Sequence, residues 1–523
     1  MTSGALDRKQ KRWLKNAVKY IMMKVIRRFA VRPVPARRSL RALRAPPILI
    51  KGVIHMSYNN ESDLHQILQQ QELIESSLSF VSSAENFIRE NGIFPPSRAE
   101  EGVMRGLRYP NGTGVIAGVT AIGDVNGYEL VDGKKVPQKG RLFYRGIDVS
   151  DIIQQCIAED RFGFEEVVYL LLFGQLPSAP QLKDFQYLLA KWSQLPSYFT
   201  EDMILRSPNR NIMNKLESCI LALHSHDNMA ENSTLEYELF KSFRMVARTP
   251  TVVAHSYAAK RHYFDKDSLY LHRTRTDLHV AENFLYSLRK DNHFDDDEAK
   301  LLDLCMILHA EHGGGNNSTF ACRVLTSAGT DFYSSIAAAV GALKGFRHGG
   351  ANIKSVEMMQ YLKHAVHNWK DDGEVKDALV RILRGELGDG TGLIYGMGHA
   401  VYTLSDPRAE ILKKFSRNLA EKKGMSDELD LIESVERLAP DIFRNERRSP
   451  KPICANVDLY SGFVYKLLGI PTELYTAIFA SARMPGWCAH RIEECCGSDP
   501  RIIRPAYKTI CKRTPYVPLS ERY

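Results

Sequence analysis

Apolar and polar positions follow different periods in different parts of the chain. Residues 115–144 are rich in Val, Ile and Gly and contain the pairs Asn126-Gly127 and Asp132-Gly133. Both pairs are typical of the tight turns in β-hairpins. Almost all of the later sequence has the apolar spacing of packed helices. The pattern therefore predicts a mainly α fold with small β-hairpins near the N-terminal third.

Start and stop signals bound several of the predicted helices. The stretch 164–177 begins with acidic residues, turns apolar and meets Gly174 and Pro177 at its end. Asp331 stands where an N-cap is expected, before a run of small residues that reaches Gly345. Small residues on a helix let a neighbouring helix approach closely, so this segment is predicted to be packed.

Two more helices and one turn follow from similar signals. Residues 295–315 begin with acids, which complement the helix dipole, and end in three glycines. Residues 471–484 place Pro471 in the first turn of a predicted helix. The Asp-Asp-Gly sequence at 371–373 predicts a surface turn.

Composition is that of a soluble globular protein, with 44% hydrophobic and 25% charged residues. A length of 523 residues predicts at least two domains. No run of about 18 apolar residues occurs, so we expect no membrane-spanning helix. Residues 1–55 hold 15 Lys and Arg against one acid, whereas the net charge of the whole chain is +9. The remainder is mildly acidic and gives no indication of nucleic-acid binding.

The basic leader 1–55 has three interpretations. It resembles an Arg-rich, acid-poor organelle presequence in composition, and it could form a basic amphipathic helix on a membrane surface. The third interpretation is that these residues are translated ahead of the natural start. Met56 opens a polar stretch typical of an N-terminus, which favours the third interpretation.

The nine cysteines are scattered and include no C-x-x-C pair. This usage predicts free thiols in a reducing compartment. One local group of sulfur and imidazole side chains has spacing that fits no standard zinc motif, so helix packing is the favoured interpretation. Its members are Cys488, His490, Cys495 and Cys496.

Two histidines stand beside flexible glycines and are candidates for binding or proton transfer. His312, in HAEHGGG, is predicted in the last turn of a helix, where the following glycines let a ligand approach the backbone. HAEH does not have the spacing of the H-E-x-x-H zinc motif, and by itself it is typical of a helix C-terminus. His348 precedes Gly349-Gly350 and is either an open proton donor or acceptor or an exposed turn residue.

The stretch GMGHAVYTLSDPR predicts an anion site. Asp406 is placed as an N-cap with Pro407 at the first helical position, so Arg408 falls in the first turn of a helix that runs to Gly424. A guanidinium at a helix N-terminus binds a carboxylate or phosphate well. His399 lies upstream in the adjoining loop, within reach of the same anion.

Asp458 stands between apolar Val457 and Leu459 at the start of a predicted helix. Apolar surroundings raise the pKa of a carboxyl and make it a better general base. The alternative is an N-cap, which is the better interpretation for this residue taken alone. Arg483 follows small residues in a further helix. Together these candidates indicate acid–base chemistry on a small polycarboxylate, without a metal or a nucleophile motif.

The ordered motifs resemble the citrate synthase family, which includes 2-methylcitrate synthase. They are LHAEHGGGNNSTF, GFRHGGAN, GMGHAVYTLSDPR, NVDLYSG, ASARMPGWCAHRIEE and IIRP. The resemblance covers residues 115–507 clearly and 56–111 loosely. It implies a large helical domain formed by 56–348 and 461–523, with a small domain at 349–460.

The resemblance also implies roles for individual residues. His348 matches the histidine that hydrogen-bonds the thioester carbonyl, and Asp458 matches the base that removes the methyl proton. His399 matches the histidine that protonates the oxaloacetate carbonyl. The implied ligands of the oxaloacetate carboxylates are His312, Arg408, Arg483 and Arg504. Arg504 would enter from the other subunit of a homodimer.

The expected activity is that of an acyltransferase making citrate from oxaloacetate and acetyl-CoA, with 2-methylcitrate synthase acting on propionyl-CoA as the alternative. Coenzyme A thioester is the expected co-substrate, with no permanently bound cofactor or metal. Thr403 replaces a residue that is often basic in relatives, so coenzyme A contacts are assigned to Arg347 or Lys354 instead. The expected location is the cytoplasm, or an organelle matrix if 1–55 is a presequence.

Two other classes of protein are weighed against this one. A non-enzymatic paralogue would be expected to have lost one of His348, His399 and Asp458, and all are present. A metal-dependent hydrolase built on HAEH would lose its activity in the presence of a chelator. Both are ranked below the synthase.

Overall fold

The computed structural model describes residues 113–132, 134–448, 452–507 and 513–522, Thr509 and scattered positions between 75 and 111. The basic leader 1–55 lies outside the described residues, so its three interpretations stay predictions. Residue contacts group the chain into two compact units, Met1–Glu101 and Gly102–Tyr523, and the description below concerns the second. Among the helices described, none is both long and apolar enough to cross a bilayer.

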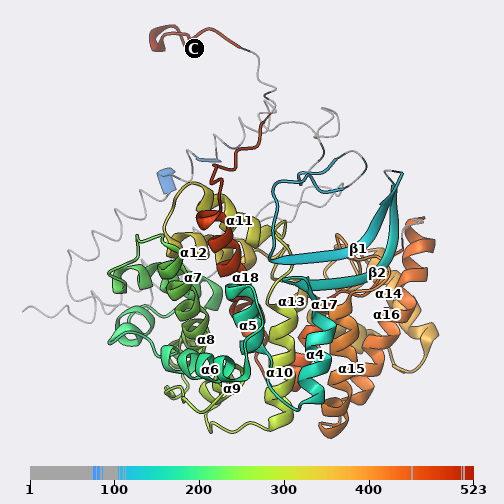
Figure 1. The fold of residues 1–523 in the computed structure, drawn as a ribbon. Helices are drawn as coiled ribbons and strands as arrows, with labels where there is room; N and C mark the ends of the chain where they lie inside the picture. Colours follow the sequence, from blue (N-terminus) through green and yellow to red (C-terminus); the bar gives the residue numbers. More distant parts are fainter. Residues whose placement is uncertain are drawn as a thin grey trace, which may run out of the picture. The chain divides into compact units, whose positions relative to one another are not determined.

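A small antiparallel sheet precedes the helices (Figure 1). It consists of β1 (Gly123–Val131), β2 (Lys134–Tyr144) and β3 (Ile147–Asp148). The hairpin predicted from Asp132-Gly133 is confirmed by its described residues, because Val131 pairs with Lys134 and Asp132 lies in a turn. The predicted turn at Asn126-Gly127 is wrong. Asn126 pairs with Arg141 whereas Tyr128 pairs with Pro137, so β2 carries extra residues opposite this point and β1 continues through it.

The rest of the second unit is helical, which confirms the predicted mainly α class. The α-helices, in chain order, are α4 (Val149–Ala158), α5 (Phe164–Phe173), α6 (Ala179–Trp192), α7 (Ile212–Leu223), α8 (Leu235–Asp265), α9 (Val280–Leu288), α10 (Asp296–His309), α11 (Asn317–Ser327), α12 (Phe332–Lys344), α13 (Ala351–Ala365), α14 (Asp372–Leu383), α15 (Pro407–Lys422), α16 (Ser426–Arg447), α17 (Val457–Leu467) and α18 (Tyr475–Cys496).

Several predicted helix ends are confirmed by their caps. Gly174 ends α5 in the left-handed conformation, at φ 82°. The Asp331 side chain accepts a hydrogen bond from Ser334 N at the start of α12. Asp406 caps α15, accepting from the backbone N–H of Arg408, as the sequence predicts.

Other boundaries differ from the prediction. Helix α10 ends at His309, so His312 lies in the turn beyond the helix and not in its last turn. Asp371 is not part of an isolated surface turn but caps α14. Asp458 is not an N-cap either, because Asn456 caps α17 and accepts from Asp458 N. An Asn or Asp two residues earlier in the chain can take the N-cap position instead, as Asn456 does here.

Helix α18 is much longer than the helix predicted at 471–484. A 3₁₀ turn at Thr472–Leu474 precedes it, and the helix continues through Pro485 and Gly486 to Cys496. Pro485 removes one backbone hydrogen bond. Nearly every residue from Tyr475 to Ile492 is buried, however, and tertiary packing outweighs the local preference.

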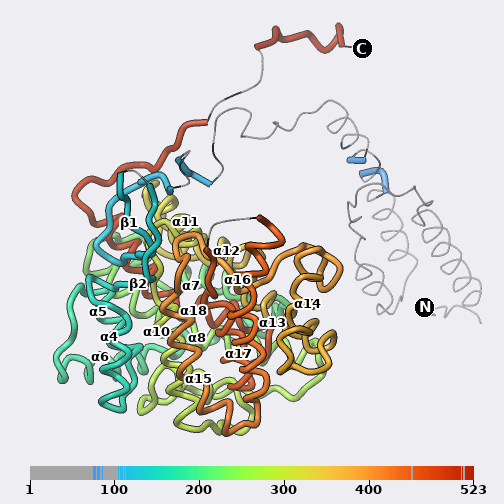
Figure 2. The backbone as a smooth tube through the Cα atoms, turned by 90° about the vertical axis from the view of Figure 1, so that its right-hand side faces the viewer, coloured from blue at the N-terminus to red at the C-terminus, as the bar shows by residue number. Residues whose placement is uncertain are grey.

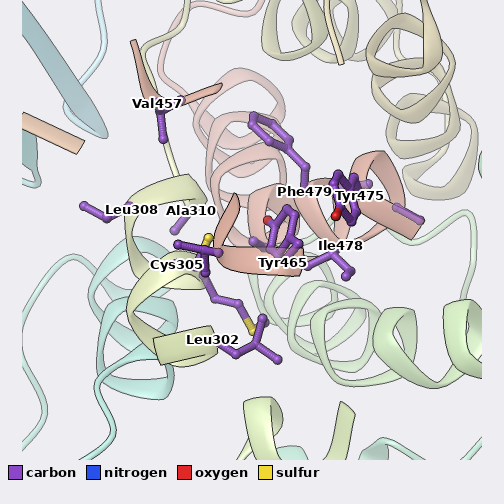
Figure 3. Close-up of a cluster of buried hydrophobic side chains, with 14 of the residues drawn as sticks. Leu302, Cys305, Leu308, Ala310, Val457, Tyr465, Tyr475, Ile478 and Phe479 are labelled. Carbon is purple, nitrogen blue, oxygen red and sulfur yellow. The ribbon is translucent and has the colours of Figure 1, made fainter. Parts of the chain in front are cut away.

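Helices α10, α17 and α18 share an apolar core that supports the site. Figure 3 shows side chains from these helices meeting in one cluster, including Leu302, Cys305, Tyr465, Ile478 and Phe479. Figure 2 shows the backbone path of α10, α17 and α18 from a second direction. Because these helices are locked together, the segments at their ends are held at fixed positions.

The described cysteines are all free, which confirms the thiol prediction for them; Cys511 lies outside the described residues. Cys488 and His490 are fully buried in α18, in agreement with the helix-packing interpretation. The division into large and small domains at Gly349 and Tyr460 stays a prediction.

Candidate active site

His348 stands between α12 and α13 and is anchored through one ring nitrogen. Its Nε2 lies 3.1 Å from Asn316 Oδ1 and 3.0 Å from Ser318 Oγ. Ser318 is itself fully buried and accepts a hydrogen bond from the Trp487 indole N–H at 3.2 Å. Burial, with the nearby positive charge of Arg483, lowers the pKa of His348 to about 4. The ring is therefore neutral at neutral pH, and Nδ1 remains for a substrate.

His399 lies in the loop before α15, and its tautomer follows from its partners. Nδ1 accepts from the backbone N–H groups of Val401 and Tyr402, each at 3.1 Å. A nitrogen that accepts cannot carry the proton, so the neutral ring is protonated at Nε2. Burial and then Arg408 lower the pKa of His399 to about 4. His399 thus presents a neutral N–H donor.

His312 is brought to His399 by the turn after α10. The two ring centroids are 5.2 Å apart, with the ring planes nearly perpendicular. His312 is buried, and its Nε2 has no hydrogen-bond partner among the described residues. Burial, followed by the charge of Arg408, holds the pKa of His312 well below its ordinary value. An unpaired buried nitrogen is a candidate contact for a ligand.

Arg408 is buried in the first turn of α15 and is already paired. Its Nε and Nη2 donate to the two Asp406 oxygens at 3.0 and 2.7 Å. Asp406 also accepts from Val457 N at 3.3 Å, which ties the start of α15 to the start of α17. In the predicted anion site, the positive charge of Arg408 is therefore already balanced by the Asp406 carboxylate, which the sequence alone did not indicate. Nη1 is not used by Asp406 and is left for a further acceptor.

Arg483 is fully buried in α18, and no carboxylate among the described residues is hydrogen-bonded to its guanidinium. Nε donates to the carbonyl of His309, whereas Nη1 has no partner in the described part of the chain. Burial lowers the pKa of Arg483 to about 10, partly offset by the negative charge of Glu311. A desolvated guanidinium with a free N–H is a strong candidate for carboxylate binding.

Asp458 is half-buried in the first turn of α17, near both arginines. Desolvation raises the pKa of its carboxyl to about 6, with Arg408 and Arg483 opposing and Asp406 adding to the rise. At neutral pH the group is mostly ionised, yet it binds a proton far better than a free carboxylate does. These are the properties of a general base.

The remaining predicted residues do not join this group within the chain. Arg504 is exposed in the segment after α18, and no hydrogen bond or ion pair links it to the site among the residues described. Arg347 is exposed with its guanidinium over the ring of Phe346. Lys354 pairs with Glu357 at 2.7 Å and lies 3.8 Å from Asp389. The Thr403 hydroxyl is buried and has no partner in the described part of the chain.

Sequence reasoning missed several contributors. Tyr402 stacks on His399, with ring centroids 4.8 Å apart and an interplanar angle of 25°. Glu311, the acidic residue of HAEH, lies 2.9 Å from His490 Nε2, and Arg323 donates to the other His490 nitrogen. The periodicity of the sequence around these residues is typical of the core. Only their position next to the candidate motifs could have indicated a role in the site.

The assembled site combines neutral histidines, one carboxyl of raised pKa and two buried guanidiniums. It can bind a small dicarboxylate, supply a general base and donate hydrogen bonds to developing oxyanions. Its side chains come from the segments after α10 and α12, the starts of α15 and α17, and α18.

Known proteins are similar to this chain in sequence and in fold. A family model described as "Citrate synthase, C-terminal domain" matches residues 108–506. Citrate synthase of Deinococcus radiodurans is 35% identical over 387 residues, which cover 73% of this chain and 93% of that protein. A 2-methylcitrate synthase of Shewanella oneidensis is 32% identical over 372 residues, covering 70% and 87%.

A solved structure extends the similarity to three dimensions. Citrate synthase of Thermoplasma acidophilum, in a ternary complex with carboxymethyl coenzyme A and oxaloacetate, has a TM-score of 0.62 and 26% identity, covering 77% of this chain and 97% of that one. The family match, the relatives and the fold agree with the motifs from which the resemblance was drawn. The chain belongs to the citrate synthase family.

Proposed function

We propose that this chain condenses oxaloacetate with acetyl-CoA and water to give citrate and coenzyme A. The observation that carries the proposal is the environment of Asp458. A carboxyl with a pKa near 6 lies beside two buried arginines, with neutral His348 and His399 in the same site. This condensation needs a base, two neutral hydrogen-bond donors and groups that bind a dicarboxylate. The last are Arg483, Arg408 and His312, which we call the carboxylate cradle.

In the first step, Asp458 removes a proton from the methyl carbon of the thioester. The electron pair moves to the carbonyl oxygen, where charge develops. His348 donates from Nδ1 to that oxygen in the tautomer in which the Ser318 hydroxyl turns from Asn316 Oδ1 to donate to His348 Nε2. Because the ring is neutral, it stabilises the enol or enolate through a hydrogen bond, without transferring its proton completely.

In the second step, the nucleophilic carbon attacks the keto carbon of oxaloacetate. His399 donates from Nε2 to the keto oxygen as it becomes an alcohol, which matches the tautomer set by the Val401 and Tyr402 N–H groups. Arg483, Arg408 and His312 hold the carboxylates, and orientation of the two reactants lowers the barrier. Water then hydrolyses the citryl thioester and releases coenzyme A.

Coenzyme A and a second subunit complete the proposal. The Thermoplasma relative binds a coenzyme A analogue together with oxaloacetate, which supports a thioester co-substrate here. Arg347 and Lys354 are the proposed phosphate contacts. Arg504 is exposed in its own chain, which suits a role in the site of a partner in a homodimer.

The pH profile gives one expected result. The carboxylate form of Asp458 is the active base, so kcat/KM for acetyl-CoA should fall as pH drops through about 6. Well below that value the rate should fall by about tenfold per pH unit. The two catalytic histidines have pKa values of about 4 and should add no step above pH 5. A rate that stays constant from pH 7.5 to pH 5 would contradict the role of Asp458.

The choice of acyl group is tested by comparing kcat/KM for acetyl-CoA and propionyl-CoA with saturating oxaloacetate, with free coenzyme A as the readout. We expect acetyl-CoA to be preferred. One methylene is worth about 1–3 kcal/mol in a pocket, so a preference of about tenfold or more is expected. The 32% sequence identity to a 2-methylcitrate synthase keeps 2-methylcitrate synthesis as the second candidate activity. A preference for propionyl-CoA would establish that activity instead.

A further inference from the structure

One buried aromatic ring lies at the centre of the residues proposed to bind oxaloacetate. Tyr402 is fully buried. Its ring stacks on His399 at 4.8 Å, meets the edge of His312 at 5.6 Å and lies 5.7 Å from the Arg408 guanidinium carbon. The backbone N–H of Tyr402 also donates to His399 Nδ1. The groups assigned to the keto oxygen and to the carboxylates therefore pack around a single side chain.

The β1–β2 hairpin also packs against this ring. A Cβ atom built on Gly140 would lie 2.7 Å from Tyr402 Cδ1 and 2.2 Å from the Ser405 carbonyl oxygen. A Cβ built on Gly127 would lie 3.1 Å from Tyr402 Cδ1 and 2.9 Å from the Val401 carbonyl oxygen. Neither glycine has a positive φ, so backbone conformation does not require glycine at these positions. Glycine is required because a side chain would not fit in the space available.

Hydrogen bonds join the hairpin to the same loop. Gly140 N donates to Ser405 Oγ at 3.2 Å, and the Tyr402 hydroxyl donates to the Arg141 carbonyl at 3.3 Å. The pairing shift in the hairpin occurs at these residues, where β2 carries extra residues opposite β1. The irregularity that overturned the predicted turn at Asn126-Gly127 is thus the place where the hairpin receives Tyr402.

We propose that Tyr402 is a positioning residue for the oxaloacetate site and that Gly127 and Gly140 form its seat. The ring prevents rotation of His399 and supports His312 and Arg408 from one side. Displacements of about 1 Å at a reacting group can cost about 10²-fold in rate. The inference rests on the proposed function, because it assigns Tyr402 to the substrate that those residues are proposed to bind.

The first test separates the ring from its hydroxyl. Tyr402→Phe keeps the ring and loses only a long hydrogen bond, so kcat/KM for oxaloacetate should stay within about threefold of wild type. Tyr402→Leu should lower it by about 10²-fold, with KM for oxaloacetate rising far more than KM for acetyl-CoA at saturating oxaloacetate. Phe185→Leu is the matched control: this buried ring of α6 packs against the rings of Tyr169 and Phe173 in α5 and Phe243 in α8, and the kinetics of this variant should be unchanged.

The second test approaches the seat from the hairpin. Gly140→Ala should displace Ser405 and Tyr402 and raise KM for oxaloacetate by about tenfold or more, because the added Cβ meets backbone on the other side. Gly118→Ala is the control, since a Cβ there meets nothing within 4 Å. This pair decides the matter even if Tyr402→Leu fails to fold.

The outcomes separate this inference from the proposed function. Wild-type protein that releases no coenzyme A with both substrates would refute the proposed function itself. Active wild type with Tyr402→Leu or Gly140→Ala at wild-type kcat/KM for oxaloacetate would overturn the positioning role. An equal rise of both KM values in these variants, matched by Phe185→Leu or Gly118→Ala, would overturn it as well.

Discussion

Replacing Asp458 by Ala should abolish condensation while oxaloacetate still binds. Asp458 is the only carboxyl assigned to carbon-acid chemistry, and its raised pKa makes it a competent base. Loss of a general base costs typically 10²–10⁴-fold, and we expect about 10³-fold or more in kcat here. The dissociation constant of oxaloacetate should change by less than about threefold, because the carboxylate cradle remains in place.

The measurement is steady-state kcat by coenzyme A release, together with oxaloacetate binding by calorimetry. Asp430→Ala is a suitable control, since this carboxylate of α16 lies in a surface ion pair with Arg417 of α15 at 2.5 Å. It should leave both quantities unchanged. Turnover by Asp458→Ala at more than about a tenth of the wild-type rate would contradict the assigned role.

Replacing Arg483 by Met should weaken oxaloacetate binding more than any other single change in the cradle. Arg483 is fully buried with a free Nη1, so a bound carboxylate would lose a desolvated charge partner. Loss of one partner of such a pair costs about 2–5 kcal/mol, which corresponds to at least about a 30-fold rise in Kd. Arg408 should contribute less, because Asp406 already occupies two of its nitrogens.

Arg491→Met controls for the burial of a positive charge in the same helix. Arg491 is equally buried in α18 and binds Glu238 at 2.9 Å, and Glu238 keeps a second partner in Lys241. We expect both variants to lose stability and only Arg483→Met to lose oxaloacetate affinity, measured by calorimetry beside thermal unfolding. Equal affinities in Arg483→Met and wild type would remove Arg483 from the site.

Much of the site could be predicted because its chemistry lies in short motifs. His348, His399 and Asp458 stand beside glycines or at helix starts, where local sequence indicates both exposure and backbone geometry. The cap at Asp406 and the position of Arg408 also follow from local rules, since a helix N-terminus has few acceptable residues.

The remainder depends on contacts between distant segments. Tyr402 has the apolar character of any core residue, and only the hairpin more than 250 residues earlier in the chain shows what it packs against. The Asn126-Gly127 pair has the composition of a turn, yet the approach of Val401 and Tyr402 makes its glycine necessary in a strand. The length of α18 similarly reflects burial along its whole surface, which overrides the local effect of Pro485 and Gly486.

The central claim is that this chain joins acetyl-CoA to oxaloacetate, and free coenzyme A release by the purified full-length protein tests it most directly. The account predicts thiol release that requires both substrates and is accompanied by one citrate for each coenzyme A. No release with both substrates present would contradict the account. Release from acetyl-CoA at the same rate without oxaloacetate would contradict it equally, because that result describes a thioesterase.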